Sequence, residues 1–122
     1  MLHKLEVLKA HIQKLNRSLP NKAVVVEGKN DVLALRGLLK ADFFILNKYK
    51  RSLYETAEVL SSRYGSALLL LDSDRKGKEL RKKMKSYLQM HGVSVQEEEK
   101  LLRLARVRAV EDLSSAELVR LL

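Results

Sequence analysis

The fold of this chain is constrained most by an apolar run that ends on two carboxylates: residues 68–74 read LLLLDSD. Four consecutive leucines predict a strand at 67–71 that is buried on both faces, as strands of parallel sheets are. An ionised carboxylate at the end of such a strand needs a cation or hydrogen bonds to compensate its charge. A second apolar strand is predicted at 23–26, and it leads into the acids of residues 27–31, EGKND. Two strands that each end in acids indicate one acidic site built to hold a divalent metal.

Length and composition place this chain among small globular domains. Its 122 residues suffice for one domain, and hydrophobic residues make up 46% of them, enough for a packed core. The absence of cysteine excludes disulfides and cysteine-based zinc sites. No stretch approaches the roughly 20 apolar residues of a membrane span, and the amino-terminal residues lack the pattern of a signal peptide. We therefore expect a cytoplasmic protein with no membrane partner.

Helical periodicity and turn residues divide the chain into alternating helices and strands. Helices are predicted at 2–18, 30–40, 52–63, 76–90 and 97–104, and a short final helix is expected to be capped by Ser114 and Glu117. Strands are predicted at 23–26, 43–46, 67–71 and 93–95, with residues 106–110 as a further edge strand. This alternation predicts a three-layer α/β/α fold, in which helices cover both faces of a mostly parallel, four-stranded central sheet. We expect an N-terminal helix and linker at 1–21, followed by one domain at 22–122.

Ligands bind at the carboxyl ends of the strands in sheets of this kind. Glu27 and Asp72 both fall at that edge, on strands that can be neighbours because one helix–strand–helix excursion connects them. Asp72 and Asp74 lie two residues apart, so they point to the same face if the chain is still extended there. Oxygen ligands of this type suit magnesium. The alternative for the two aspartates is capping of the following helix, and the alternative for Asp31 is capping of the helix after Glu27.

Histidine is not expected to contribute to this site. His3 and His11 fall on the first predicted helix and His91 lies near a turn, so none of them stands beside a motif. We expect all three at the surface, and no transition-metal site made from histidine.

The pairing of EGKND at 27–31 with DSDRKG at 72–77 resembles the Toprim domain. That domain is shared by topoisomerases, bacterial-type primases, overcoming-lysogenisation-defect nucleases, recombination-mediator proteins and the 5S-rRNA maturase. The similarity extends from about residue 22 to residue 113, so the domain expected at 22–122 is similar to a Toprim domain. The chain most resembles the small stand-alone members, which are primase-like or maturase-like, and the resemblance implies a Rossmann-like fold.

The resemblance also implies a role for each matched residue. Glu27 matches the glutamate that acts as general acid or base in phosphoryl transfer. Asp72 and Asp74 match the aspartates that coordinate Mg²⁺, for which Mn²⁺ can substitute, and Asp31 matches the acid that helps to hold a second metal in the nuclease branches. The turn glycines of the family are matched by Gly28 and Gly77. The chemistry implied is metal-assisted attack on a phosphodiester.

The charge balance favours a polyanionic partner. The chain carries 24 basic and 15 acidic side chains, a net charge of +9, and several of the acids belong to the predicted site. Phosphate contacts are predicted for the cations nearest the motifs: Lys29, Arg75 and Lys76. Further cations are predicted to share one solvated face of the helix at 76–90: Lys78, Arg81, Lys82 and Lys85. A second cluster follows the strand at 43–46: Lys48, Lys50 and Arg51.

Two functions are compatible with these residues. The first is Mg²⁺-dependent phosphodiester chemistry on RNA or DNA, by a nuclease, an RNA-processing enzyme or a primase-like nucleotidyl transferase. The second is an accessory module that binds nucleic acid and has little catalytic activity of its own. Both are compatible with a homodimer or with a larger nucleic-acid-processing assembly.

Overall fold

The structure of this protein is a computed structural model, which describes residues 2–48 and 52–122. Its elements are α1 (Leu2–Ser18), β1 (Ala23–Val26), α2 (Lys29–Leu35), β2 (Asp42–Ile45), η1 (Leu46–Lys48), α3 (Leu53–Ser61), β3 (Ser66–Leu69), α4 (Arg75–Met90), β4 (Ser94–Glu97), α5 (Lys100–Ala105), η2 (Val110–Ser115) and α6 (Glu117–Arg120). Strands alternate with helices, so the predicted α/β class is confirmed. Among the described residues, no helix combines the length and apolar character that a membrane span requires.

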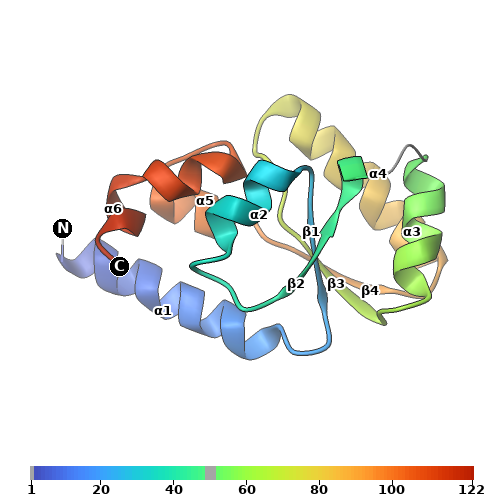
Figure 1. Cartoon of the computed structure of the whole chain (residues 1–122), viewed down its shortest axis with the longest axis horizontal. Helices are drawn as coiled ribbons and strands as arrows, with labels where there is room; N and C mark the ends of the chain where they lie inside the picture. The colour runs from blue at the N-terminus through green and yellow to red at the C-terminus, as the bar shows by residue number, and fades with distance from the viewer. Residues whose placement is uncertain (1, 49–51) are drawn as a thin grey trace.

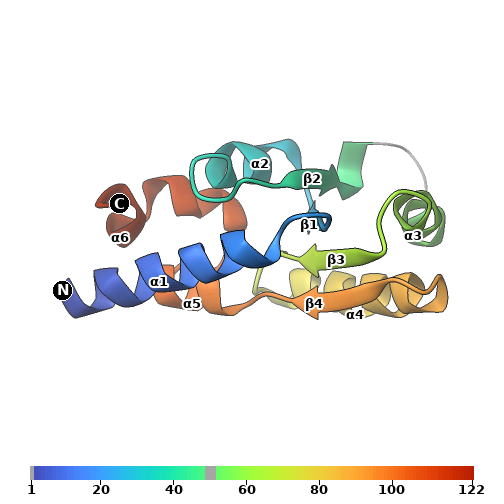
Figure 2. The same ribbon diagram turned by 90° about the horizontal axis from the view of Figure 1, so that it is seen from below.

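The strands form one parallel sheet in the order β2-β1-β3-β4 (Figure 2). β1 is central, and its Val25 pairs with Phe44 of β2 on one side and with Leu69 of β3 on the other. All four carboxyl ends therefore lie at one edge of the sheet. The segments that follow β1 and β3 leave that edge side by side, which confirms the four-stranded sheet and the predicted neighbourhood of the two motif-bearing strands.

Helices cover both faces of the sheet, and each face has its own apolar core. Successive strand residues point to opposite faces. Val24 and Leu68 pack in the core beneath α1, α2, α5 and η2, whereas Val25 and Leu69 pack in the core beneath α3 and α4. Figure 1 shows α1, α5 and α6 on one side of the molecule and α3 and α4 on the other. Burial on both faces explains why these strands are apolar throughout.

Helix α1 packs onto the same core as the rest of the chain. Leu8 and Leu15 of its inner face are buried there. The side chain of Asn16 donates a hydrogen bond to the Leu38 carbonyl and accepts one from the Lys40 backbone N–H, both at 2.9 Å. These bonds tie α1 to the segment between α2 and β2. The division of the chain at residue 21 stays a prediction.

The edge strand predicted at 106–110 is wrong. The Ser73 backbone N–H and hydroxyl both donate to the Arg108 carbonyl, at 2.8 and 3.2 Å, and the Val110 N–H donates to Oδ1 of Asp72 at 2.8 Å. These backbone groups of the segment bond to the loop after β3, so they do not join a sheet edge.

Smaller predictions are also corrected. The final helix begins after Ala116 and not after Ser114, and no side chain caps it. His11 is not a surface residue, because 9% of its side chain is exposed and its Nε2 lies 2.9 Å from Oε2 of Glu98. His91 is half-buried. The helix predicted at 30–40 is shorter, since α2 gives way to a turn before residue 37, a glycine.

Candidate functional site

Glu27 leaves β1 at the carboxyl edge of the sheet. Its side chain is half-buried, and its Oε1 lies 3.6 Å from Nζ of Lys76 in the first turn of α4. Its backbone carbonyl accepts a hydrogen bond from the Asn47 N–H at 3.0 Å. Glu27 therefore lies between the segment that follows β2 and the start of α4.

Asp31 is a buried acid in the first turn of α2, with 7% of the residue exposed. Its Oδ2 accepts a hydrogen bond from the Gly28 N–H at 3.0 Å, so Asp31 takes part in capping α2. Burial raises the pKa of the Asp31 carboxyl, and the Gly28 bond partly opposes that rise. Three nearby carboxylates raise this pKa further: Asp72, Glu111 and Glu27. Four acids thus share one neighbourhood.

Asp72 enters this neighbourhood because β3 pairs with β1. Its Oδ1 accepts the hydrogen bond from the Val110 N–H, which fixes the start of η2 at the carboxyl edge of the sheet. Glu111 follows directly in the chain. The bond thereby also places Glu111 beside the other acids.

The acids line one cavity of about 300 Å³, which we call the acidic cavity. Its lining residues are Glu27, Gly28, Lys29, Asn30, Asp31, Asn47, Asp72 and Glu111. The structure thus brings together three of the four acids that the sequence pointed to, from the ends of two strands and the start of one helix. Glu111 was missed, because its spacing in the sequence relates it to neither motif.

Asp74 is not brought into the acidic cavity. It is the N-cap of α4, and its Oδ1 accepts a hydrogen bond from the Gly77 N–H at 2.7 Å. It lines a different cavity, together with Ser73 and Arg75. The two aspartates of the DSD motif therefore face different cavities here, and the role of Asp74 as a metal ligand stays a prediction.

The two motif glycines differ in what their positions require. Gly77 lies within the first turn of α4, where an added Cβ would come 2.7 Å from the carbonyl carbon of Asp72 and closer still to its oxygen. Only glycine permits this approach of α4 to the end of β3. Gly28 has an extended φ of −143°, and no atom lies within 4 Å of an added Cβ, so neither backbone conformation nor space requires glycine there. Its contribution to the site is the backbone N–H that donates a hydrogen bond to Asp31.

The predicted phosphate-binding cations are divided between the two cavities. Lys29 lines the acidic cavity, and Lys76 reaches toward it through Glu27. Arg75 lines the other cavity, and its Nε is 3.5 Å from Oε1 of Glu79. The side chains of the second predicted cluster, at residues 48, 50 and 51, lie outside the described part of the chain.

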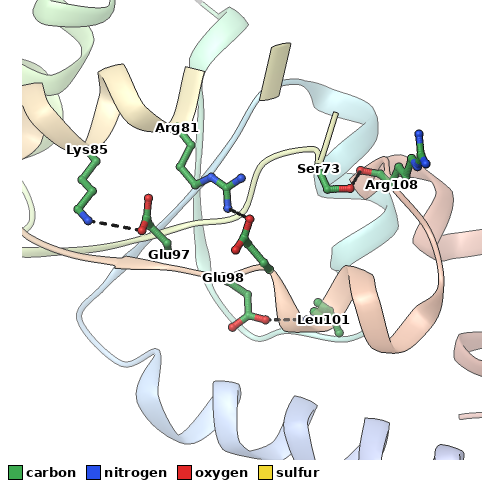
Figure 3. A network of polar contacts seen from close by, with 8 residues as sticks. Ser73, Arg81, Lys85, Glu97, Glu98, Leu101 and Arg108 are labelled. Carbon is green, nitrogen blue, oxygen red and sulfur yellow. Dashed lines mark hydrogen bonds and ion pairs between the residues drawn. The ribbon is translucent and has the colours of Figure 1, made fainter. Parts of the chain in front are cut away.

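Two cations that were expected on a solvated face of α4 instead hold that helix to β4 and the residues after it. Arg81 is buried, with 6% of the residue exposed, and it forms an ion pair with Glu99. Nζ of Lys85 lies 3.4 Å from Oε2 of Glu97 (Figure 3). The prediction of a solvated face is therefore wrong for Arg81.

The donor set of the acidic cavity fits Mg²⁺. Carboxylate and amide oxygens are the ligands that this hard cation prefers. In residues 2–48 and 52–122, no three acids or histidines are placed to hold a metal by themselves. Mg²⁺ does not need such a cage, since it usually keeps several waters and binds through one or two carboxylates together with substrate phosphates. Asp31 and Asp72 each use one oxygen for the backbone bond described above, which leaves the second oxygen of each for a cation.

Comparisons with known sequences agree with the motifs. The family model described as "Toprim domain" matches residues 22–110. A "UPF0292 protein" of Thermococcus gammatolerans is 40% identical over 96 residues, which cover 75% of this chain and 70% of that protein. A UPF0292 protein of Pyrococcus abyssi is 34% identical over 113 residues, with 88% and 82% covered.

Comparisons with solved structures agree with the fold. A putative protein from Aquifex aeolicus superposes with a TM-score of 0.62 at 23% identity, covering 92% of this chain and 96% of that one. The Aquifex aeolicus primase structure, with zinc-binding and RNA polymerase domains, gives a TM-score of 0.55 at 21% identity, covering 89% of this chain and 27% of the primase chain. At these identities the likeness is one of fold, and it confirms the predicted α/β architecture.

Proposed function

We propose that this chain, which belongs to the Toprim domain family, carries out Mg²⁺-dependent phosphodiester chemistry on nucleic acid at the acidic cavity. The family match indicates a function related to nucleic acid. The observation that carries the proposal is the convergence of Glu27, Asp31 and Asp72 on one cavity from separate elements. Like charges held together oppose folding unless something compensates them. A bound cation would offset the repulsion among these carboxylates and so explain why they are held together.

Each residue of the cavity has a part in the proposed chemistry. Asp31 and Asp72 would hold the cation, and Mg²⁺ would stabilise the charge that develops on the phosphate. Glu27 lines the cavity as the general acid or base, which takes a proton from the attacking water or hydroxyl or gives one to the leaving oxygen. Lys76, which lies 3.6 Å from Glu27, contributes positive charge beside the phosphate. Asp74 caps α4 through Oδ1 and lines the neighbouring cavity, so we give it no part in this chemistry.

Cleavage assays with end-labelled single- and double-stranded RNA and DNA, in Mg²⁺, Mn²⁺ or EDTA, test the proposal. Glu27→Gln keeps the shape of the side chain and removes its ability to take a proton, so turnover is expected to fall by about 100-fold or more while binding persists. Glu58→Gln is the matched control, because Glu58 is an exposed acid of α3 that lines neither the acidic cavity nor the cavity at Asp74.

The proposal fails if purified protein binds these substrates and leaves all of them intact in both metals. That result supports the alternative function, an accessory module that holds nucleic acid for another enzyme. Equal losses in Glu27→Gln and Glu58→Gln would likewise remove Glu27 from the chemistry.

A further inference from the structure

We propose that a second cavity, beside the acidic one, binds the phosphate backbone of the substrate strand one or two nucleotides from the reacting phosphodiester. This inference rests on the proposed function for the identity of the strand. Its test uses no metal and no turnover, so the two can fail separately.

The second cavity, which we call the basic cavity, has a volume of about 770 Å³ and is larger than the acidic cavity. It lies where the loop after β3, the first turns of α4 and the segment before η2 meet. Four of its lining side chains are cations, Arg75, Lys78, Lys82 and Arg108, and two are acids, Asp74 and Glu79. The cations come from two segments of the chain, α4 and the segment before η2.

The two acids of the basic cavity offset only part of its positive charge. Asp74 caps α4 and keeps its negative charge there, and Glu79 pairs with Arg75 at 3.5 Å. Within residues 2–48 and 52–122, no carboxylate forms an ion pair with the remaining three cations: Lys78, Lys82 and Arg108. An anion that enters the cavity therefore meets an excess of positive charge, from four cations against two acids.

The other cations of α4 show the contrast. Arg81 is paired with Glu99 and Lys85 with Glu97, so their charges serve to attach α4 to β4 and to the residues after it (Figure 3). Lys78 and Lys82 are exposed and lie on the wall of the basic cavity. Helix α4 thus carries one set of cations that binds the protein itself and another set that faces a cavity.

The segment that brings Arg108 to the basic cavity is held in place by the loop after β3. The Ser73 backbone N–H and hydroxyl both donate to the Arg108 carbonyl, and Figure 3 shows the hydroxyl bond. The Arg108 side chain is therefore carried on a backbone that is fixed to the loop. Fixing one side of the cavity lowers the ordering cost of binding a phosphate there.

The two cavities are lined by consecutive residues, an arrangement that suits a polymer able to occupy both. Asp72 lines the acidic cavity, whereas Ser73 and Asp74 line the basic cavity. Two residues span at most about 7 Å of chain, and a nucleic-acid strand in a duplex advances about 3.4 Å per nucleotide. A strand with one phosphate at the acidic cavity therefore reaches the basic cavity within about two nucleotides, a distance that a single small anion does not bridge.

Fluorescence anisotropy with a labelled single-stranded RNA or DNA tests the inference in EDTA. The double variant Lys78→Ala with Lys82→Ala is compared with Lys9→Ala with Lys83→Ala, which also removes two exposed lysines but none that lines either cavity. For an oligonucleotide of about 12 nucleotides, the first variant is expected to bind about tenfold more weakly. The slope of log K against log salt should become shallower by about 1.4, because each contact with a single strand contributes about 0.7. The control variant should stay within about twofold of the wild type.

Two further measurements keep the inference open to refutation. Arg108→Ala leaves the backbone bonds of Arg108 intact and should also weaken binding. The inference is overturned if both lysine pairs weaken binding equally, or if the first pair leaves the salt slope unchanged. It is also overturned if tripolyphosphate binds as tightly as the oligonucleotide, since the cavity would then be a site for small anions.

Discussion

Replacing Gly77 with alanine tests whether α4 packs against the end of β3 as closely as the structure shows. The added Cβ would lie 2.7 Å from the carbonyl carbon and 3.1 Å from the Cα of Asp72, and closer still to the carbonyl oxygen. All of these are backbone atoms, so no side-chain rotation relieves the clash. The first turn of α4 must therefore move away from β3, and the Asp74 cap moves with it.

The size of the effect follows from two opposing contributions. Helix propensity alone favours alanine over glycine by about 1 kcal/mol in a helix interior. Overpacking a buried site costs about 1–3 kcal/mol, and a clash with backbone belongs at the upper end of that range. The net expectation for Gly77→Ala is a loss of about 2 kcal/mol in the free energy of unfolding.

Urea unfolding followed by circular dichroism measures this loss, with Gly37→Ala as the matched control. Gly37 has no atom within 4 Å of an added Cβ and no positive φ. Alanine there should stabilise the protein by about 0.4–1 kcal/mol, because it restricts the unfolded chain. The two substitutions should thus have opposite signs. A Gly77→Ala protein as stable as the wild type would refute the close packing of α4 on Asp72.

Three further substitutions have expected outcomes. Arg81→Met should lower the free energy of unfolding in urea by about 1–2 kcal/mol, because it removes the ion pair with the half-exposed Glu99. Oligonucleotide binding should stay unchanged, and a loss of binding without a loss of stability would contradict this expectation. His11→Ala should lower the free energy of unfolding by about 1–3 kcal/mol, because it leaves the buried carboxylate of Glu98 with one hydrogen bond fewer. A double-mutant cycle with Glu98→Gln should show that the two side chains are energetically coupled. Glu111→Gln should weaken Mn²⁺ binding by about tenfold in calorimetry, and an unchanged affinity would place Glu111 outside the metal environment.

The position of Glu27 beside Asp72 could be predicted from the sequence, because it follows from strand order alone. Apolar runs identified β1 and β3, and the carboxyl ends of neighbouring parallel strands meet at one edge. The placement of Asp74 could not be decided in this way. It depends on whether the chain stays extended for two residues after Asp72 or turns to cap a helix, and the spacing of the motif allows both.

Contacts that are distant in the sequence account for the other differences. Glu111 reaches the acidic cavity because the Val110 N–H bonds to Asp72, which is 38 residues away, and no periodic pattern reports such a bond. Arg81 was grouped with the solvated lysines of its helix because its pairing partner, Glu99, belongs to another element. A pattern confined to one helix does not show which residues of that helix face an acid on its neighbour.

Binding of a divalent cation in the acidic cavity is the claim on which the proposed function depends, and anomalous diffraction from crystals soaked in MnCl₂ tests it most directly. The expected result is an anomalous peak within coordination distance of Asp31 and Asp72, present in the wild type and absent in Asp72→Asn. Wild-type crystals with no peak in this cavity, or with Mn²⁺ bound only at Asp74 in the other cavity, would contradict the claim.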